Sequence, residues 1–335
     1  MPDPNPGETL SRLQRQHGAE LRLSRLLDAH LDELPLPGAG RTLDRWRWLA
    51  AVAACDLSLV KLFEGHTDAL AILAELGGPD VPPGSAWGTW CAEPPDARLE
   101  FRPDGDDGRL RIDGTKAWCS GAASVDHALV SGWDADGRPC LAAVALRQPG
   151  VRVTDTGWQA VGMAGSASVN VCFDRAVGQA VGGPGDYTAR PGFWQGGIGV
   201  AACWFGGAQA IADMAMEQSR GRSDPHRLAH LGEIDVALSG AAAVLREAAA
   251  AIDSHPQANA QELALRARLV VEAACDAVLR HATRALGAGP LCRNARFARL
   301  VADLPVYLRQ SHAERDLAAL GQGTVDSGGA RPWTL

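Results

Sequence analysis

Apolar residues recur at three- and four-residue steps in the first quarter of the chain, as they do along one face of a helix. Leu59 to Leu76 shows this pattern with alanines between the larger side chains. The Gly77-Gly78-Pro79 run then ends it, because glycine and proline are poor helix formers. We therefore predict an N-terminal helical domain over residues 1–83.

The pattern changes to short alternating runs over residues 85–182. Arg109 to Ile112 alternates polar and apolar positions, and Val169 to Phe173 largely does the same. Turn signals such as Asp113-Gly114 and Asp136-Gly137 separate the runs. We predict a middle domain over residues 84–183, built as an antiparallel sandwich or barrel.

Helical periodicity returns from about residue 190, with many glycines and alanines. Leu228 to Ile252 and Leu263 to Leu286 are long amphipathic segments. Small side chains between them would allow close approach of helices, so residues 184–321 are predicted to form a helical bundle. The tail 322–335 is turn-rich, and we expect it to be loose. This order of elements predicts the α+β class.

The composition of the chain argues against several classes of function and location, namely nucleic-acid binding, metal binding, secretion and membrane insertion. The chain has 335 residues, 46% of them hydrophobic, and a net charge of −7, which disfavours binding to nucleic acid. Eight cysteines lie far apart without a CxxC pair, and no histidine cluster suggests a metal site. The polar N-terminus does not resemble a signal peptide, and no run of 18 uncharged apolar residues appears. We expect a cytoplasmic protein without a membrane segment.

One phrase carries a specific resemblance. Residues Ile112 to Gly121 read IDGTKAWCSG, with Trp118 and Ser120 two positions apart. This run, together with the order helical, β, helical, resembles the acyl-CoA dehydrogenase flavoprotein superfamily from about residue 40 to 321, with a shorter N-terminal domain than usual. The resemblance implies FAD, with Trp118 against the flavin ring and Ser120 near its N5 atom. An ordinary hairpin with a half-buried tryptophan is the structural alternative.

Two further phrases of the β region support the resemblance. Trp90-Cys91-Ala92-Glu93-Pro94 is similar to a segment whose backbone lies against the flavin pyrimidine, which implies cofactor-binding roles for Trp90 and Ala92. The phosphate-binding G-A-G-S-D loop that follows in the family is replaced by Pro95 to Leu99. Residues Trp158 to Ser168 are similar to the family's run into its last β strand, for which we expect an architectural role.

The C-terminal region adds residues implied by the resemblance. Gly287, Ala288 and Gly289 resemble a turn that lies against FAD bound to a neighbouring subunit, in a four-helix bundle. Arg222 falls where the family binds the pyrophosphate, and Arg315 falls near residues that reach the partner's FAD. The resemblance therefore implies a homodimer or homotetramer. A helix C-cap at Gly287 and solvated arginines are the structural alternatives.

The expected catalytic carboxylate is missing. In the gapless register, the position of the family's glutamate base falls on Ser311, with His312 next, and the alternative base position falls near Gly197. A hydroxyl alone cannot remove a proton next to a thioester. Ser311 and His312 are more similar to the flavin monooxygenase branch, in which a histidine near the flavin can steer protons. His312 could also simply cap a helix.

Three functions follow from these observations. The first is an FAD-dependent oxidoreductase acting on an acyl thioester or a related acyl substrate, with an unknown electron acceptor. The second keeps the flavin and changes the reaction to monooxygenation through His312. The third is a degenerate homologue that acts as a subunit partner without catalysis.

Overall fold

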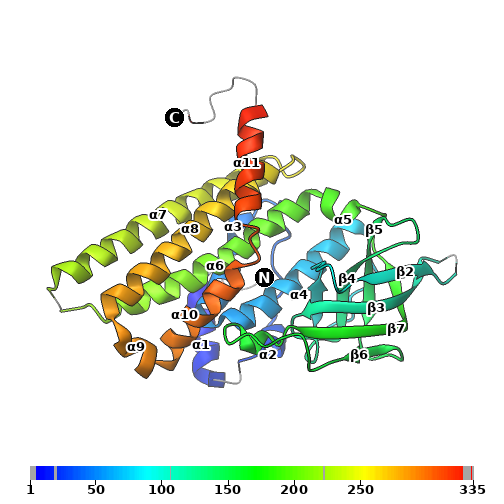
Figure 1. Ribbon diagram of the computed structural model, residues 1–335, viewed down its shortest axis with the longest axis horizontal. Helices are drawn as coiled ribbons and strands as arrows, with labels where there is room; N and C mark the ends of the chain where they lie inside the picture. Colours follow the sequence, from blue (N-terminus) through cyan, green and yellow to red (C-terminus); the bar gives the residue numbers. More distant parts are fainter. Residues whose placement is uncertain (1–4, 19–20, 106, 222, 327–332, 334–335) are drawn as a thin grey trace.

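The computed structural model describes residues 5–18, 21–105, 107–221, 223–326 and 333. A helical part, a strand-rich part and a second helical part follow one another along the chain, which confirms the predicted α+β order. Figure 1 shows the strands at one end of the elongated molecule, the long helices α7 and α8 at the other, and α4 between them. The three domain limits set above stay predictions.

The N-terminal part contains α1 (Pro6–His17), α2 (Leu23–Asp28), α3 (Thr42–Cys55) and α4 (Leu57–Leu76). The Asp56 side chain starts α4 by accepting a hydrogen bond from the Leu59 backbone N–H at 2.8 Å. Gly77, at φ 71°, ends it in the left-handed conformation that glycine adopts at little cost. The helix therefore ends at the Gly77-Gly78-Pro79 run, as predicted.

The described residues form seven strands: β1 (Trp87–Trp90), β2 (Leu99–Pro103), β3 (Arg109–Cys119), β4 (His127–Trp133), β5 (Pro139–Ala145), β6 (Val151–Val153) and β7 (Val169–Ala180). The pairings β4–β5, β5–β7, β7–β3, β3–β2 and β2–β4 return to the first strand, so these five strands form a closed ring. β1 and β2 pair with β4 in parallel, so the expectation of a purely antiparallel domain was wrong. Alternation in the sequence predicts strands, but long-range packing selects their partners.

The C-terminal part contains α5 (Asp186–Ala189), α6 (Pro191–Glu217), α7 (Pro225–Ser254), α8 (Gln261–Leu286), α9 (Ala288–Arg293), α10 (Ala295–Leu308) and α11 (Glu314–Asp326). Helix α11 continues past Gly321, so residues 322–326 are helical and the expectation of a loose tail was wrong there. The remaining tail, apart from residue 333, lies outside the described residues.

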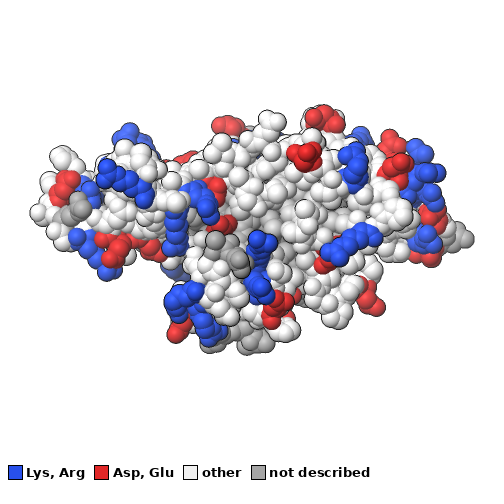
Figure 2. Space-filling model, turned by 90° about the horizontal axis from the view of Figure 1, so that it is seen from below, with Lys and Arg blue, Asp and Glu red and all other residues white. Residues whose placement is uncertain are grey.

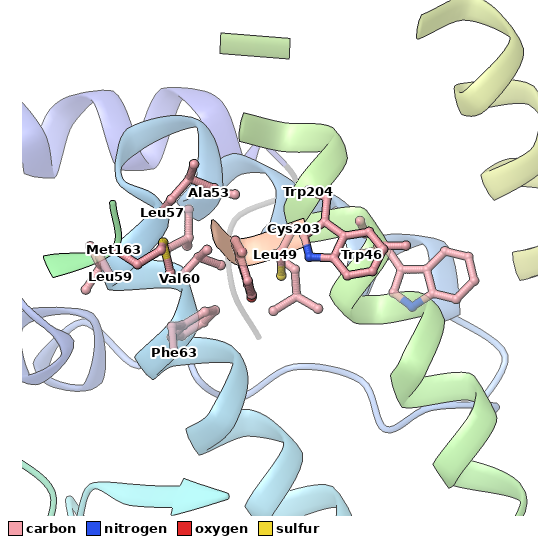
Figure 3. Packing of buried hydrophobic residues seen from close by; sticks show 14 of the residues in the cluster. Trp46, Leu49, Ala53, Leu57, Leu59, Val60, Phe63, Met163, Cys203 and Trp204 are labelled. Atoms are coloured by element: carbon pink, nitrogen blue, oxygen red, sulfur yellow. The ribbon is translucent and has the colours of Figure 1, made fainter. Parts of the chain in front are cut away.

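Helix α4 joins the strands to the helices. The Thr89 hydroxyl of β1 donates to the Gly65 carbonyl at 2.7 Å, and the Trp87 backbone N–H donates to His66 Nδ1 at 3.1 Å. On its other side, α4 belongs to a core that also includes Trp46 of α3 and Trp204 of α6, both at most 2% exposed. Figure 3 shows these two tryptophans and Phe63 of α4 among the buried hydrophobic side chains. One face of α4 is thus fixed to β1, while another lies in the helical core.

Two helices in the described part of the chain, α6 and α7, are long and apolar enough to cross a membrane by length and composition alone. In α6, 72% of the apolar window is buried, as in the core helix of a soluble protein, whereas the α7 window is only 17% buried. On the face shown in Figure 2, basic and acidic side chains are intermixed, with a broad uncharged area between them. That face carries no continuous basic track of the kind that follows a phosphate backbone.

Candidate functional site

Trp118 has an unusual backbone conformation for a strand residue. Its register against β7 is shifted between Lys116 and Cys119, and its φ angle is +55°. A non-glycine residue in this left-handed region costs about 1–3 kcal/mol, so such strain points to function. The bulge leaves the Trp118 side chain 50% exposed on a strand whose neighbours are largely buried. A flat aromatic side chain is thereby exposed at the surface of the β domain.

Ser120, two residues later, is fixed by a chain of hydroxyl groups. Its Oγ lies 2.7 Å from Ser168 Oγ, which lies 2.8 Å from Ser166 Oγ. The Ser120 carbonyl accepts a hydrogen bond from Trp90 Nε1 at 3.1 Å. Trp90 as a whole is only 2% exposed, so its buried side chain positions Ser120 from inside the protein. Ala92 lies just beyond, partly exposed in the loop after β1.

The run from Trp158 to Ser168 attaches the β domain to α10. The Met163 backbone N–H donates to the buried Asp303 carboxylate at 2.5 Å. A Cβ atom at Gly162 would lie 2.0 Å from the Ala302 carbonyl oxygen, so only glycine allows this approach. Burial raises the pKa of Asp303 despite the hydrogen bond from Met163. These contacts agree with an architectural role for the run.

An ion pair with a buried lysine lies beneath the same strand. Lys116 is fully buried, and its ammonium donates to Glu93 Oε1 at 2.6 Å and to the Ser131 carbonyl at 2.9 Å. Trp133 Nε1 donates to Glu93 Oε2 at 2.9 Å. Burial raises the pKa of Glu93, but the hydrogen bonds from Lys116, Ser131 and Trp133 outweigh it and leave the pKa lowered. Glu93 is therefore a fixed anion that holds the loop after β1 to the sheet.

Ser311 and His312 lie in the turn between α10 and α11. The buried Ser311 hydroxyl donates to Glu272 Oε2 at 2.5 Å, while Arg309 donates to Glu272 Oε1 at 2.8 Å. His312 is 59% exposed in its side chain, with Nδ1 3.3 Å from Asp316 Oδ1. A carboxylate thus lies beside the predicted base position, but both of its oxygens are occupied.

The other C-terminal predictions lie on the surface. Gly287 ends α8 at φ 68°, and Ala288 and Gly289 are exposed at the start of α9. Arg315 is exposed on α11, and Arg222 lies outside the described residues. The predicted C-cap at Gly287 is present, and the contact with a partner's cofactor stays a prediction.

Sequence reasoning missed a layer of charged side chains between α4 and α6. Lys61 and Glu64 form an ion pair at 3.0 Å, with side chains only 16% and 10% exposed. One turn further, Asp68 Oδ1 would lie 3.2 Å from a Cβ atom at Gly196 of α6. The spacing of Lys61, Glu64 and Asp68 at i, i+3 and i+7 places them on one helix face within an otherwise apolar helix. These charged positions on one face of the helix were the signal in the sequence from which the layer could have been predicted.

Further charges complete the layer from other helices. Arg190 donates to Glu75 Oε2 at 2.7 Å, and its Nη2 lies 3.9 Å from Asp68 Oδ1. Arg268 of α8 donates to the Gly197 carbonyl at 2.6 Å and stacks over the Trp204 ring at 4.8 Å. Burial raises the pKa of Asp68, with Glu64 adding to the effect and Arg190 opposing it. The layer therefore passes directly beside Gly196 and Gly197.

The same layer reaches the loop after β1. Burial raises the pKa of the Cys91 thiol to about 11, and the nearby charges of Lys116, Asp68 and Arg190 also act on it. Tyr187 of α5 lies beside both Cys91 and Asp68, and burial raises its pKa. Asp68 is thus close to the Trp90 to Pro94 segment, whose backbone was predicted to lie against a flavin.

Solved structures share this architecture along nearly the whole chain. FMN-bound TdsC from Paenibacillus sp. A11-2, a dibenzothiophene monooxygenase, matches with a TM-score of 0.77 and 22% identity, over 94% of this chain and 89% of that one. Nitrososynthase from Micromonospora carbonacea var. africana matches with a TM-score of 0.78 and 19% identity, over 95% of each chain. The methanesulfinate monooxygenase MsuC from Pseudomonas fluorescens matches with a TM-score of 0.76 and 21% identity, over 90% and 89%.

The chain has the acyl-CoA dehydrogenase fold. The resemblance drawn from the Ile112 to Gly121 phrase is therefore confirmed at the level of the fold. At these sequence identities the match shows the fold alone, and it does not show which substrate or cofactor this chain binds. No protein-family model and no curated protein matches the sequence.

Within the acyl-CoA dehydrogenase fold, contacts bring some of the predicted residues together in two groups. A hydrogen bond joins Trp90 to Ser120, which follows the end of β3 two residues after Trp118. Ser311 and His312 form the second group, with Glu272 and Asp316 as partners. No described contact joins the two groups directly. Arg268 connects the second group to the charged layer, because it donates to the Gln310 carbonyl at 3.0 Å as well as to Gly197.

Proposed function

We propose that the protein is a flavin-dependent monooxygenase that uses FMN. The observation that carries this proposal is Trp118, which is half-exposed and held in a strained bulge two residues before the fixed Ser120. The fold shared with FMN-bound TdsC and with MsuC supports it. The acyl-CoA dehydrogenase reaction, our first hypothesis from the sequence, is the weaker candidate.

The described residues fit the flavin ring system, which FMN and FAD share, better than they fit the additional phosphate of FAD. Trp118 would cover the isoalloxazine ring, and Ser120 would provide polar atoms near it. The loop from Pro94 to Arg98 contains no glycine or serine to donate to a second phosphate. FMN needs fewer phosphate contacts than FAD, and this difference supports FMN over the FAD implied by the resemblance.

A bound flavin supplies hydride acceptance or, once reduced, oxygen activation. Dehydrogenation next to a thioester additionally needs a carboxylate base over the substrate. At the two expected positions stand Ser311 and a glycine pair at 196–197, and Glu272 is held by Ser311 and Arg309. Monooxygenation does not require that base, so the residues present favour it.

Flavin titration of the wild-type protein and Trp118→Ala tests the cofactor assignment. Removing a half-exposed stacking indole should cost about 1–2 kcal/mol, or roughly 5- to 30-fold in FMN affinity, measured by fluorescence quenching. Trp118→Phe keeps an aromatic face and should retain most of the affinity. Equal FMN affinity in all three proteins would place the ring elsewhere, and no flavin binding in any of them would favour the degenerate homologue.

The reaction type is tested on the flavin-loaded protein. We expect octanoyl-CoA to leave the flavin oxidised under anaerobic conditions, while the chemically reduced protein consumes oxygen on mixing with air. Bleaching by octanoyl-CoA would instead establish dehydrogenation. Ser311→Glu is a poor rescue of that activity, because it would bring a second carboxylate beside the buried Glu272.

A further inference from the structure

Three serine hydroxyl groups link the end of β3 to the loop before β7. Ser120 Oγ lies 2.7 Å from Ser168 Oγ, which lies 2.8 Å from Ser166 Oγ. The Ser166 hydroxyl in turn lies 2.8 Å from the Met163 carbonyl oxygen. Ser166 and Ser168 are only 1% and 4% exposed, so water does not compete for these contacts. The chain of contacts therefore runs from the half-buried Ser120 into the interior and ends at a carbonyl group.

The number of hydrogen atoms in this chain fixes the direction of every hydrogen bond. Two oxygen atoms this close together repel each other unless a hydrogen atom lies between them. There are three such contacts, and three hydroxyl hydrogens are available, one from each serine. The Met163 carbonyl can only accept, so Ser166 donates to it. Ser168 must then donate to Ser166, and Ser120 must donate to Ser168.

Both donors of Ser120 are thereby committed within the described structure. Its backbone N–H donates to the Trp118 carbonyl at 3.0 Å, and its hydroxyl hydrogen is directed to Ser168. Its carbonyl oxygen accepts the hydrogen bond from Trp90 Nε1. The Ser120 hydroxyl has a second lone pair besides these contacts, and it therefore faces a ligand as a hydrogen-bond acceptor.

An acceptor at this position distinguishes the two redox states of a flavin. The N5 atom of the oxidised ring carries a lone pair, whereas the N5 atom of the reduced ring carries a hydrogen. Under the proposed function, Ser120 is expected beside N5. Two lone pairs that face each other leave both acceptors unsatisfied, while an N–H group facing a lone pair forms a hydrogen bond. The direction of the serine chain therefore favours the reduced ring.

We propose that Ser166 and Ser168 are positioning residues that make Ser120 an acceptor and thereby give the site a preference for reduced over oxidised FMN. This inference rests on the proposed flavin-dependent function and deepens it, because it names the form of the cofactor that the site selects. It also gives the run from Trp158 to Ser168 a role beyond the architectural one predicted from the sequence. Both buried serines act on the flavin only through Ser120.

The test compares the affinities of the protein for oxidised FMN and for dithionite-reduced FMN under anaerobic conditions. Calorimetry gives both dissociation constants. We expect the wild-type protein to bind reduced FMN at least about tenfold more tightly than oxidised FMN. For a two-electron couple, tenfold corresponds to a midpoint potential about 30 mV above that of free FMN. Spectroscopic reduction against a reference dye measures this potential without any turnover.

Two variants interrupt the chain, and a third leaves it intact. Ser168→Ala removes the acceptor of the Ser120 hydroxyl, whose hydrogen can then turn toward the lone pair of an oxidised ring. We expect the preference for reduced FMN to fall at least about fivefold in Ser168→Ala and to fall also in Ser166→Ala, with a lower midpoint potential in both. Ser124→Ala is the matched control, because the Ser124 hydroxyl belongs to the same turn but donates to the Gly121 carbonyl at 2.9 Å. It should keep the wild-type preference.

The variants are expected to keep the backbone of the site in place. The Gly121 backbone N–H donates to the Ser166 carbonyl at 2.8 Å, and this bond between the two segments involves no side chain.

Equal affinity of the wild-type protein for both forms of FMN, or a preference for the oxidised form, would overturn the proposal. A preference that survives unchanged in Ser168→Ala or in Ser166→Ala would do the same, as would an equal loss in Ser124→Ala. Binding of both forms without a preference would leave the cofactor assignment standing and reject this inference alone. Absence of FMN binding in either redox state would reject both.

Discussion

At the residue scale, the buried Lys116–Glu93 pair supports the strand that carries Trp118. Lys116→Met keeps the length of the side chain but leaves Glu93 without its cation. Breaking a buried pair typically costs about 3–5 kcal/mol, and we expect about 2–3 here because the Glu93 side chain keeps 29% exposure. Urea unfolding monitored by circular dichroism measures the change. Arg102→Met, which breaks an exposed pair with Glu100, is the control and should cost less than about 1 kcal/mol.

The same variant has a predicted pH signature. The pKa of Glu93 is lowered in the folded protein, so its contribution to stability is present above the unfolded pKa and is lost as pH falls through the folded one. In Lys116→Met, the lysine no longer offsets the effect of burial on the Glu93 pKa, so the contribution of Glu93 to stability disappears. The stability difference between wild type and variant should therefore shrink between about pH 5 and pH 3. A constant difference over that range would show that Glu93 does not act as the partner.

Candidate site residues could be predicted from the sequence where they lie together in one short segment. Trp118 and Ser120 were found because their spacing and neighbours are contiguous in the chain. The buried position of Asp68 was missed, because it depends on Gly196, 128 positions later, and a charged residue on a helix usually faces water. Glu272, 39 residues before Ser311, was missed for the same reason.

At the element scale, the glycines of α6 set how closely α3 can approach. A Cβ atom at Gly206 would lie 2.0 Å from the Ala50 carbonyl oxygen and 2.6 Å from its Cα atom. Both are backbone atoms, so Gly206→Ala can be accommodated only if the helices move apart. We expect a loss of at least about 2 kcal/mol in the free energy of unfolding, measured by urea denaturation.

Gly321→Ala provides the matched control for Gly206→Ala. Gly321 lies in the exposed helix α11, and no atom would lie within 4 Å of an added Cβ. Alanine is the better helix former, so this change should be neutral or stabilising by up to about 1 kcal/mol. Equal effects of the two substitutions would mean that helix propensity, rather than close packing, decides at residue 206.

The elements themselves were largely predictable, and their pairing was not. Helical periodicity located α4, α7 and α8, and glycine-rich turns separated the strands. The parallel pairing of β1 with β4 joins Trp87 to His127, forty positions later in the chain. Such a contact depends on how the whole ring closes, so no local pattern carries it.

At the scale of the whole molecule, the apolar helix α7 has much less cover than the apolar helix α6. Its apolar window is only 17% buried, and Val236 and Leu228 are 72% and 51% exposed. An apolar helix face of this length is expected to be covered by another surface. This observation adds to the homodimer or homotetramer that the resemblance implied from Gly287 to Gly289 and Arg315.

We therefore predict self-association through α7. Light scattering at micromolar concentration should report a dimer or a tetramer, and Val236→Arg should shift the population toward monomer, because an apolar contact then has to bury a charge. Since Val236 is largely exposed in the single chain, the variant should keep its helix content and its thermal unfolding as a monomer. Arg246→Ala, on an exposed polar position of the same helix, should leave the assembly intact. A wild-type monomer, or association that survives Val236→Arg unchanged, would show that another surface or none mediates assembly.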